Sequence, residues 1–151
     1  MLLYRICLTK YAAQLYPSGQ AGRWNFAGEK VIYTAGTVAM ACLENLVHRS
    51  GAALVGDFTL LTLFAPPVAA IDQIREEQLP SAWEQNPIFS RRLGNRWLMI
   101  GATAVCKVPS AIIQQEYNYL FNPNHPDFQL IQIVYRQPFN FDKRLTTQSR
   151  E

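Results

Sequence analysis

Charged residues are scarce in this sequence, and neither sign dominates. Of the 151 residues, 17% are charged and 49% are hydrophobic, and 14 Lys and Arg stand against 11 Asp and Glu, which leaves a net charge of +3. A chain this apolar can bury a core, which excludes an intrinsically disordered protein. The excess of positive charge is too small to indicate nucleic-acid binding by itself. We expect one domain over residues 1–151.

Long hydrophobic runs and paired cysteines are also absent. The longest mainly apolar stretch, Leu60 to Ile71, is interrupted by Pro66 and Pro67 and is shorter than the roughly 20 residues that a membrane helix needs. Arg5 and Lys10 break the N-terminal segment before it reaches signal-peptide length. The three cysteines form no CxxC pair, which argues against a disulfide framework and a zinc site. We therefore expect a reduced, cytoplasmic protein that does not bind membranes.

Common nucleotide-binding and hydrolase motifs are missing as well. The chain has no GxGxxG after a predicted strand, no P-loop, no GxSxG and no HExxH. A serine hydrolase triad would need His48 or His125, the two histidines of the chain, and no motif around either of them supports such a triad. These absences leave the familiar dehydrogenase, nucleotidase, serine hydrolase and zinc protease classes without support.

The pattern of apolar residues predicts more strands than helices. Strands are expected at 2–8, 31–35, 52–65, 105–108, 115–120 and 130–136. They are not regularly interleaved with helices. We therefore expect an α+β domain with a central, partly antiparallel sheet rather than a doubly wound parallel sheet.

Two helices are predicted. The stronger one covers 37–49, where Thr37 is a suitable N-cap, Arg49 favours the C-terminal end and Gly51 provides the stop. A second helix is expected at 89–102, although a glycine weakens it, and 72–78 is ambiguous.

The loop GRWNFAG contains the first candidate for chemistry. Arg23 lies there between small residues, so nothing bulky blocks access to its guanidinium group. The planar donors of arginine suit a pyrophosphate or a carboxylate. The alternative is a structural role, in which Arg23 pairs with a carboxylate of the protein and Trp24 fills the core. Both interpretations stay open at the level of sequence.

Glu44 is the second candidate, because it lies among small and apolar residues in the middle of the stronger helix. A carboxylate in that position is either exposed on the far face or held at a pocket by a partner, since an isolated buried charge is costly. His48 follows one turn later and can share a face with Glu44. Two such ligands are too few for a metal site, so we expect no metal.

Ser110 and a group of arginines complete the candidates. Pro109 fixes the backbone before Ser110, which favours a well-placed binding hydroxyl, but Ser110 is equally suited to cap the segment that follows. Arg91, Arg92 and Arg96 form a basic patch on the second helix without the interleaved aromatic residues of a nucleic-acid-binding platform. We interpret the patch as a solvated face and expect no direct nucleic-acid binding.

Several motifs, in this order, resemble the RES-domain family. They are GRWNFAGEKVIYTAGTVAMACLENLVH, KVPSAII, QEYNYLFNPNHPDF and PFNFDKRL, and the resemblance extends from Tyr4 to Leu145, with its weakest part between Gly51 and Asn86. Members of this family are toxins of RES–Xre toxin–antitoxin pairs, and their fold is similar to that of ADP-ribosyltransferases. The resemblance implies that residues 1–151 form one RES domain with such a fold.

The resemblance also implies a substrate and four site residues. RES toxins act on NAD, either degrading it or transferring ADP-ribose to a protein, so NAD is the expected substrate. The Arg, Tyr, Glu and Ser of the family fall on Arg23, Tyr33, Glu44 and Ser110. In this interpretation Glu44 is catalytic and stabilises an oxocarbenium-like transition state, and Arg23 grips the pyrophosphate and is both catalytic and substrate-binding. Tyr33 packs against nicotinamide and Ser110 hydrogen-bonds nicotinamide or its ribose.

Three functions follow from this comparison. The first is a toxin that depletes NAD as a glycohydrolase or phosphorylase, the second is a protein ADP-ribosyltransferase, and the third is a non-catalytic interaction module. The implied partner is an Xre-like helix-turn-helix antitoxin, the implied complex is one that can contain a homodimer of the toxin, and any DNA binding would belong to that partner. The patch of Arg91, Arg92 and Arg96 is a candidate surface for an acidic partner. His48 is either a general base or, more simply, a histidine packed against its helix.

Overall fold

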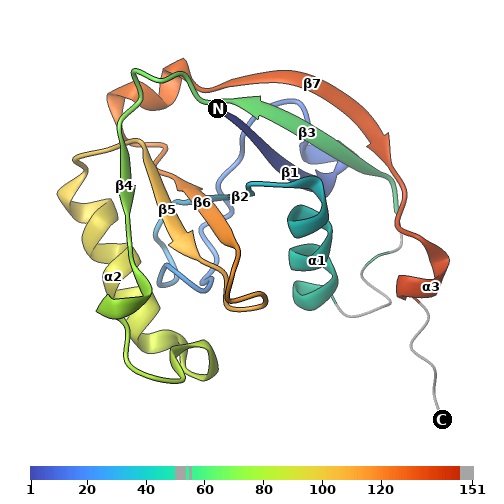
Figure 1. Ribbon diagram of the computed structural model, residues 1–151. Coiled ribbons are helices and arrows are strands. Elements are labelled where there is room, and N and C mark those ends of the chain that lie inside the picture. The colour runs from blue at the N-terminus through green and yellow to red at the C-terminus, as the bar shows by residue number, and fades with distance from the viewer. Residues whose placement is uncertain (50–53, 55, 147–151) are drawn as a thin grey trace, which may run out of the picture.

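The computed structural model describes residues 1–49, 54 and 56–146, and a seven-stranded mixed sheet forms its centre (Figure 1). The strands are β1 (Leu2–Leu8), β2 (Ile32–Ala35), β3 (Phe58–Phe64), β4 (Ile71–Gln73), β5 (Val105–Pro109), β6 (Tyr117–Phe121) and β7 (Gln132–Phe139). Their order across the sheet is β4-β5-β6-β2-β1-β3-β7. β4 and β5 pair in parallel and the other neighbours pair antiparallel. This confirms the predicted α+β class with a partly antiparallel sheet.

The helices are α1 (Val38–His48), α2 (Pro87–Ile100) and α3 (Lys143–Thr146). The predicted cap of α1 is confirmed, because Thr37 Oγ1 accepts a hydrogen bond from Met40 N at 3.1 Å. Gly51, the expected stop, lies outside the described residues. Among the residues that are described, no helix is long and apolar enough to cross a membrane.

Both long helices pack on the same face of the sheet. Met40 and Ala41 of α1 contact β1, β2 and β3, and Trp97 of α2 packs in a cluster with buried residues of β5 and β6. Leu120 of β6 lies opposite Tyr33 of β2 and opposite Cys106 of β5. Residues that lie opposite each other on neighbouring strands point to the same face, so the side chain of Tyr33 shares a face with the side chains under α2. The two helices stand apart over different strands in Figure 1. A site can therefore form on this face between them.

The opposite face is covered by irregular segments. Leu3, Ile32, Leu61 and Phe121 are buried there in one cluster. The cover comes from the segment after η1 (Thr9–Tyr11) and from η5 (Pro126–Leu130). This second core anchors the middle of the sheet and leaves the helical face free to carry the site.

The sheet is weakly joined between β1 and β2. These strands share one registered pair, Tyr4 with Ala35, whereas β1 and β3 pair along seven residues. Arg5 lies next to this junction, and its Nη1 donates to the carbonyl oxygen of Tyr33 at 3.0 Å. The side chain of Arg5 therefore bridges the junction between β1 and β2, and Arg5 is among the residues that line the cavity described below.

Candidate active site

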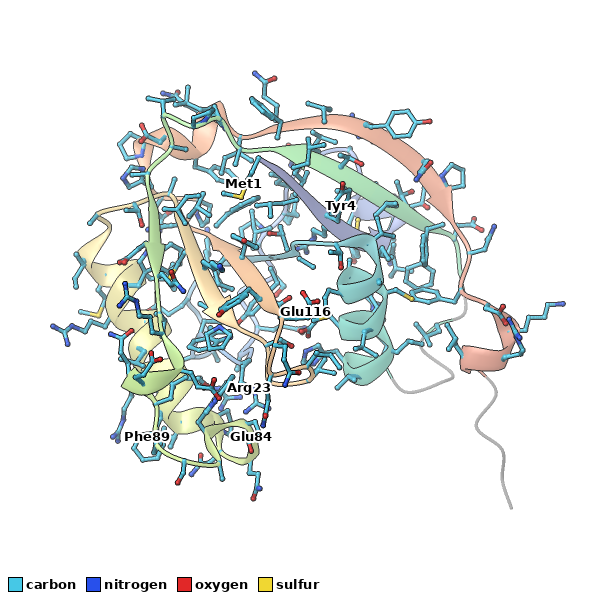
Figure 2. All side chains as sticks on the ribbon, in the orientation of Figure 1. Met1, Tyr4, Arg23, Glu84, Phe89 and Glu116 are labelled. Atoms are coloured by element: carbon cyan, nitrogen blue, oxygen red, sulfur yellow. The ribbon has the colours of Figure 1, made fainter. Side chains whose placement is uncertain are left out.

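A cavity of about 410 Å³ lies where β1, β2, β6 and α1 meet the loop of residues 18–23. Three of the four predicted site residues line it: Arg23 from the loop, Tyr33 from β2 and Glu44 from α1. Figure 2 labels Arg23, which lies between α2 and α1 in that view. The volume falls in the range of small-molecule sites, about 300–1,000 Å³. Segments that are distant in sequence therefore converge on one site.

The hydroxyl of Tyr33 fastens the loop that carries Arg23 to β2. Trp24 N donates to Tyr33 Oη at 2.9 Å, and Tyr33 Oη donates to Asn25 Oδ1 at 2.7 Å. Burial raises the pKa of Tyr33, so the phenol keeps the proton that it donates. A Cβ at Gly22 would lie 2.4 Å from Tyr33 Oη, so the loop needs a glycine there.

The same loop is held from its other side by α2. Ser90 Oγ donates to the carbonyl oxygen of Arg23 at 2.7 Å, and Arg91 Nε donates to that of Gly22 at 2.8 Å. The prediction that Arg91 belongs to a solvated patch is therefore wrong: the residue is half-buried and contacts the backbone of the site loop, although its two companions in the patch are exposed. Two successive carbonyl groups of the loop are thus held by one helix.

Three arginines, Arg5, Arg23 and Arg49, give the cavity a positive charge. The salt bridges among the described residues join Glu44 to His48 and Asp142 to Arg144, so none of the three guanidinium groups forms a salt bridge with a carboxylate there. Nη1 of Arg23 is buried without a hydrogen-bond partner in that part of the chain. Unsatisfied buried donors are rare in proteins and indicate a missing acceptor. The arrangement therefore favours an anion.

Arg5 was not among the predicted site residues. Burial lowers the pKa of its guanidinium group, the neighbouring Cys7 side chain offsets part of this shift, and the nearby charge of Arg49 lowers the pKa further. An anion in the cavity would relieve both of the effects that lower the pKa. In the sequence, a single charged residue inside the otherwise apolar strand LLYRICL was the signal for this role.

Glu44 provides the carboxylate of the cavity and is held on both oxygens. Asn118 Nδ2 donates to its Oε1, and His48 Nε2 lies 3.2 Å from its Oε2. The Glu44 side chain is 22% exposed and that of His48 is 62% exposed. His48 is therefore largely exposed and contacts its own helix one turn earlier, and its role as a general base stays a prediction. Among the described residues no group of three or more potential ligands could hold a metal.

Comparisons with known proteins identify the family of this chain. A family model of the RES domain matches residues 2–142. The chain belongs to the RES-domain family. It is 35% identical over 153 aligned residues to "Toxin Res" of Photorhabdus laumondii, covering 96% of this chain and 97% of the relative. It is also 33% identical over 128 residues to "Prs ADP-ribosylating toxin" of Sphingobium sp., covering 82% of this chain and 80% of that protein.

A solved structure shares the fold of this RES domain. It is the M. tuberculosis MbcT-MbcA toxin-antitoxin complex, in which one chain aligns with a TM-score of 0.67 and 15% identity, covering 91% of this chain and 83% of that chain. At this identity the likeness establishes the arrangement of strands and helices. The predicted α+β fold is thus found both in the structure and in a solved relative.

The fourth predicted residue of the RES domain, Ser110, does not line the cavity. It is fully buried after β5, and its Oγ accepts hydrogen bonds from Ile112 N at 3.1 Å and Ile113 N at 3.2 Å. These contacts match the local capping role that the sequence left open. Its expected contact with a substrate stays a prediction.

Asn118 was also missed in the sequence. It is 7% exposed, lines the cavity from β6 and contacts the predicted catalytic carboxylate of Glu44. The two residues are 74 positions apart, and a single asparagine in a strand carries no signal of the partner that its side chain will contact. Only the register of β6 against β2, with Asn118 opposite Ala35, brings the two groups together.

Proposed function

We propose that this protein is the toxin of a toxin–antitoxin pair and consumes NAD by cleaving its nicotinamide–ribose bond. The observation that carries the proposal is one cavity with an anchored carboxylate, Glu44, among three guanidinium groups. A dinucleotide presents the complementary charges, because its pyrophosphate is anionic and its nicotinamide ring is cationic. The names of the RES relatives, "Toxin Res" and "Prs ADP-ribosylating toxin", support the same class of activity.

Arginines bind the pyrophosphate in this proposal. Arg23 offers the unpartnered Nη1, and its backbone is fixed by Tyr33 and α2, so its fork needs little ordering when the anion arrives. Arg5 and Arg49 add positive charge from β1 and from the end of α1. Guanidinium groups pair with phosphate oxygens in a bidentate way, which orients the dinucleotide as well as binding it.

Glu44 acts on the ribose. When the bond between C1′ of the ribose and the ring nitrogen breaks, the electron pair leaves with neutral nicotinamide and positive charge develops on the ribose ring. A fixed carboxylate stabilises that charge more than it stabilises the ground state, which lowers the barrier. An incoming hydroxyl group then forms a bond to C1′ and loses its proton. His48, beside the carboxylate at the exposed mouth, is the candidate to take this proton.

Tyr33 lines the cavity, whereas Ser110 lies outside it, so the two residues would contact the substrate in different ways. The ring of Tyr33 lines the cavity and is the candidate surface for nicotinamide, while its hydroxyl is occupied by Trp24 and Asn25. Ser110 keeps a hydroxyl proton that the two backbone bonds do not use. We propose a contact from this proton to the substrate, which requires that the residues covering Ser110 move aside, because Ser110 is fully buried outside the cavity lining.

The acceptor of ADP-ribose distinguishes the possible reactions. Water gives ADP-ribose, inorganic phosphate gives ADP-ribose 1″-phosphate, and a protein side chain gives a modified protein. The Sphingobium relative is named for the third reaction, so protein ADP-ribosylation is the second candidate. Incubation of the purified protein with labelled NAD, with and without phosphate and with a cell extract, separates the three products.

Replacement of Glu44 by glutamine tests the role of the carboxylate. We expect nicotinamide release to fall by about 100-fold or more, because the amide keeps the shape and loses the charge. Glu84→Gln is the matched control, since Glu84 is a half-buried glutamate outside the cavity and its loss should leave the rate unchanged. Equal rates in Glu44→Gln and the parent protein would contradict the proposal.

The proposed partner is an antitoxin of the Xre type that binds a homodimer of the toxin. Its role is to protect the NAD of the cell while the toxin is stored. Arg92 and Arg96 are exposed and stay available for an acidic partner, whereas Arg91 is occupied by the site loop. Expression of the chain alone in bacteria should arrest growth and lower cellular NAD. A non-catalytic interaction module would do neither.

A further inference from the structure

One hydrogen bond ties the proposed catalytic carboxylate to the sheet. Asn118 stands on β6 opposite Ala35 of β2, on the face that carries Tyr33, and its Nδ2 donates to Glu44 Oε1. The Asn118 side chain is buried, while the second contact of Glu44, to His48, lies at the exposed mouth. A buried contact to a rigid strand restricts the carboxylate far more than an exposed contact within one helix.

The second polar atom of Asn118 shows that this contact has a cost. Its Oδ1 is buried and has no hydrogen-bond partner among the described residues. Buried side-chain oxygens are nearly always satisfied, so an exception calls for an explanation. Turning the amide over would not help, because it would place Oδ1 against the Glu44 carboxylate. The carboxylate therefore dictates the orientation of the amide, and the protein tolerates an unsatisfied oxygen to keep that donor.

We propose that Asn118 is the positioning residue of the active site, which holds Glu44 Oε1 through Nδ2 in the orientation that the ribose requires. The proposal rests on the proposed function for the reaction that it assists. An amide suits this position because it donates a hydrogen bond without bringing charge. A carboxyl group at the same place would have to carry a proton to make the same bond.

Asn118→Asp tests this requirement through the pH profile of kcat. At acidic pH the introduced carboxyl shares a proton with Glu44 and makes the bond, so kcat should approach that of the parent protein. At higher pH both groups ionise and repel, and kcat should fall by about tenfold per pH unit relative to the parent protein. KM should change far less than kcat.

Other charged or titratable groups line the cavity around Glu44. They are His48 on the same helix, Tyr33 on β2, whose phenol stays protonated, Arg5 on β1, Arg23 in the site loop and Arg49 after α1. These groups are unchanged in the variant, so the ratio of its activity to that of the parent protein at each pH removes their own titration from the comparison.

Asn122→Asp is the matched control. Asn122 is 2% exposed and follows the same strand, but its Oδ1 accepts a bond from Asn124 N and it lies outside the cavity. If a buried carboxyl merely weakened the fold at higher pH, both variants would show the same loss. A selective loss in Asn118→Asp supports positioning, and a profile of Asn118→Asp that parallels the parent protein overturns it.

A crystal structure of Asn118→Ala gives a second measurement that does not depend on activity. The proposal predicts that the Glu44 carboxylate leaves its present position or adopts several positions. An unmoved carboxylate would overturn the proposal even if the parent protein cleaves NAD. Conversely, a displaced carboxylate in a protein that releases no nicotinamide would support the positioning role and contradict the proposed function.

Discussion

Replacing Tyr33 by phenylalanine removes one oxygen atom at the centre of the site loop. The hydroxyl accepts from Trp24 N and donates to Asn25 Oδ1, and both of these residues are buried, with 1% and 0% exposure. Each group left without a partner costs about 1–3 kcal/mol. We therefore expect Tyr33→Phe to lose about 2–6 kcal/mol of unfolding free energy for the two groups together, which lowers Tm by roughly 5–20 °C in a domain of this size.

We expect Tyr33→Phe to weaken the binding of NAD more than it slows the chemical step. The ring that we propose as the surface for nicotinamide is retained in Tyr33→Phe, while the loop that carries Arg23 loses its connection to β2. KM for NAD should therefore rise more than kcat falls. Calorimetry or urea unfolding measures the stability, and nicotinamide release at varied NAD concentration measures the kinetics.

Tyr119→Phe provides the control for this prediction. Tyr119 is also half-buried and lies on β6 opposite Thr34, the neighbour of Tyr33. It points to the other face of the sheet, and its hydroxyl forms no hydrogen bond among the described residues. It should lose much less stability. An unchanged Tm and an unchanged KM in Tyr33→Phe would refute the account of how the loop is held.

Two further predictions concern stability. Gly94→Ala should destabilise the protein by about 2 kcal/mol or more, because a Cβ there would lie 1.9 Å from the carbonyl oxygen of Trp24. This loss outweighs the better helix propensity of alanine. As a control, Arg92→Ala, at an exposed position of the same helix, should change the free energy of unfolding by no more than about 0.5 kcal/mol. Burial raises the pKa of the Cys106 thiol from 9.0 to about 12, so the unfolded state ionises first and stability falls as the pH rises above 9. Urea unfolding of the parent protein and Cys106→Ala should therefore show their difference in unfolding free energy shifting by about 1 kcal/mol between pH 9 and pH 10, and a constant difference would contradict this.

Elements with a strong local signal were predicted well from the sequence. The apolar run of β1 and the N-cap Thr37 of α1 are in the structure as expected. The strand predicted at 52–65 begins only at Phe58 among the described residues, and 52, 53 and 55 lie outside them. The helix predicted at 89–102 spans Pro87–Ile100 instead, because Asn86 caps it.

Features that depend on tertiary contacts were not predictable in this way. β4 has three exposed residues and exists through parallel pairing with β5, so the segment carried no pattern of its own. The glycine at position 94 was read as a weakness of its helix, yet it is what allows Trp24 to approach. β7 continues through Pro138, which an edge strand permits.

The residues of the site also fall into two groups, those with a signal in the sequence and those that depend on tertiary contacts. Arg23, Tyr33 and Glu44 belong to motifs that could be compared with a family, and the structure brings them to one cavity. Arg5 and Asn118 join that cavity only through the pairing of β1, β2 and β6. No local pattern in a single sequence encodes which strands become neighbours, so these two residues had to be found in the structure.

In the proposed function, the cavity between Arg23 and Glu44 splits NAD at its nicotinamide–ribose bond. The release of free nicotinamide from NAD by the purified protein, with Glu44→Gln measured in parallel, reports this cleavage. We expect turnover by the parent protein and its loss, by about 100-fold or more, in the variant. NAD that stays intact in the presence of the parent protein, with and without phosphate and cell extract, would contradict it.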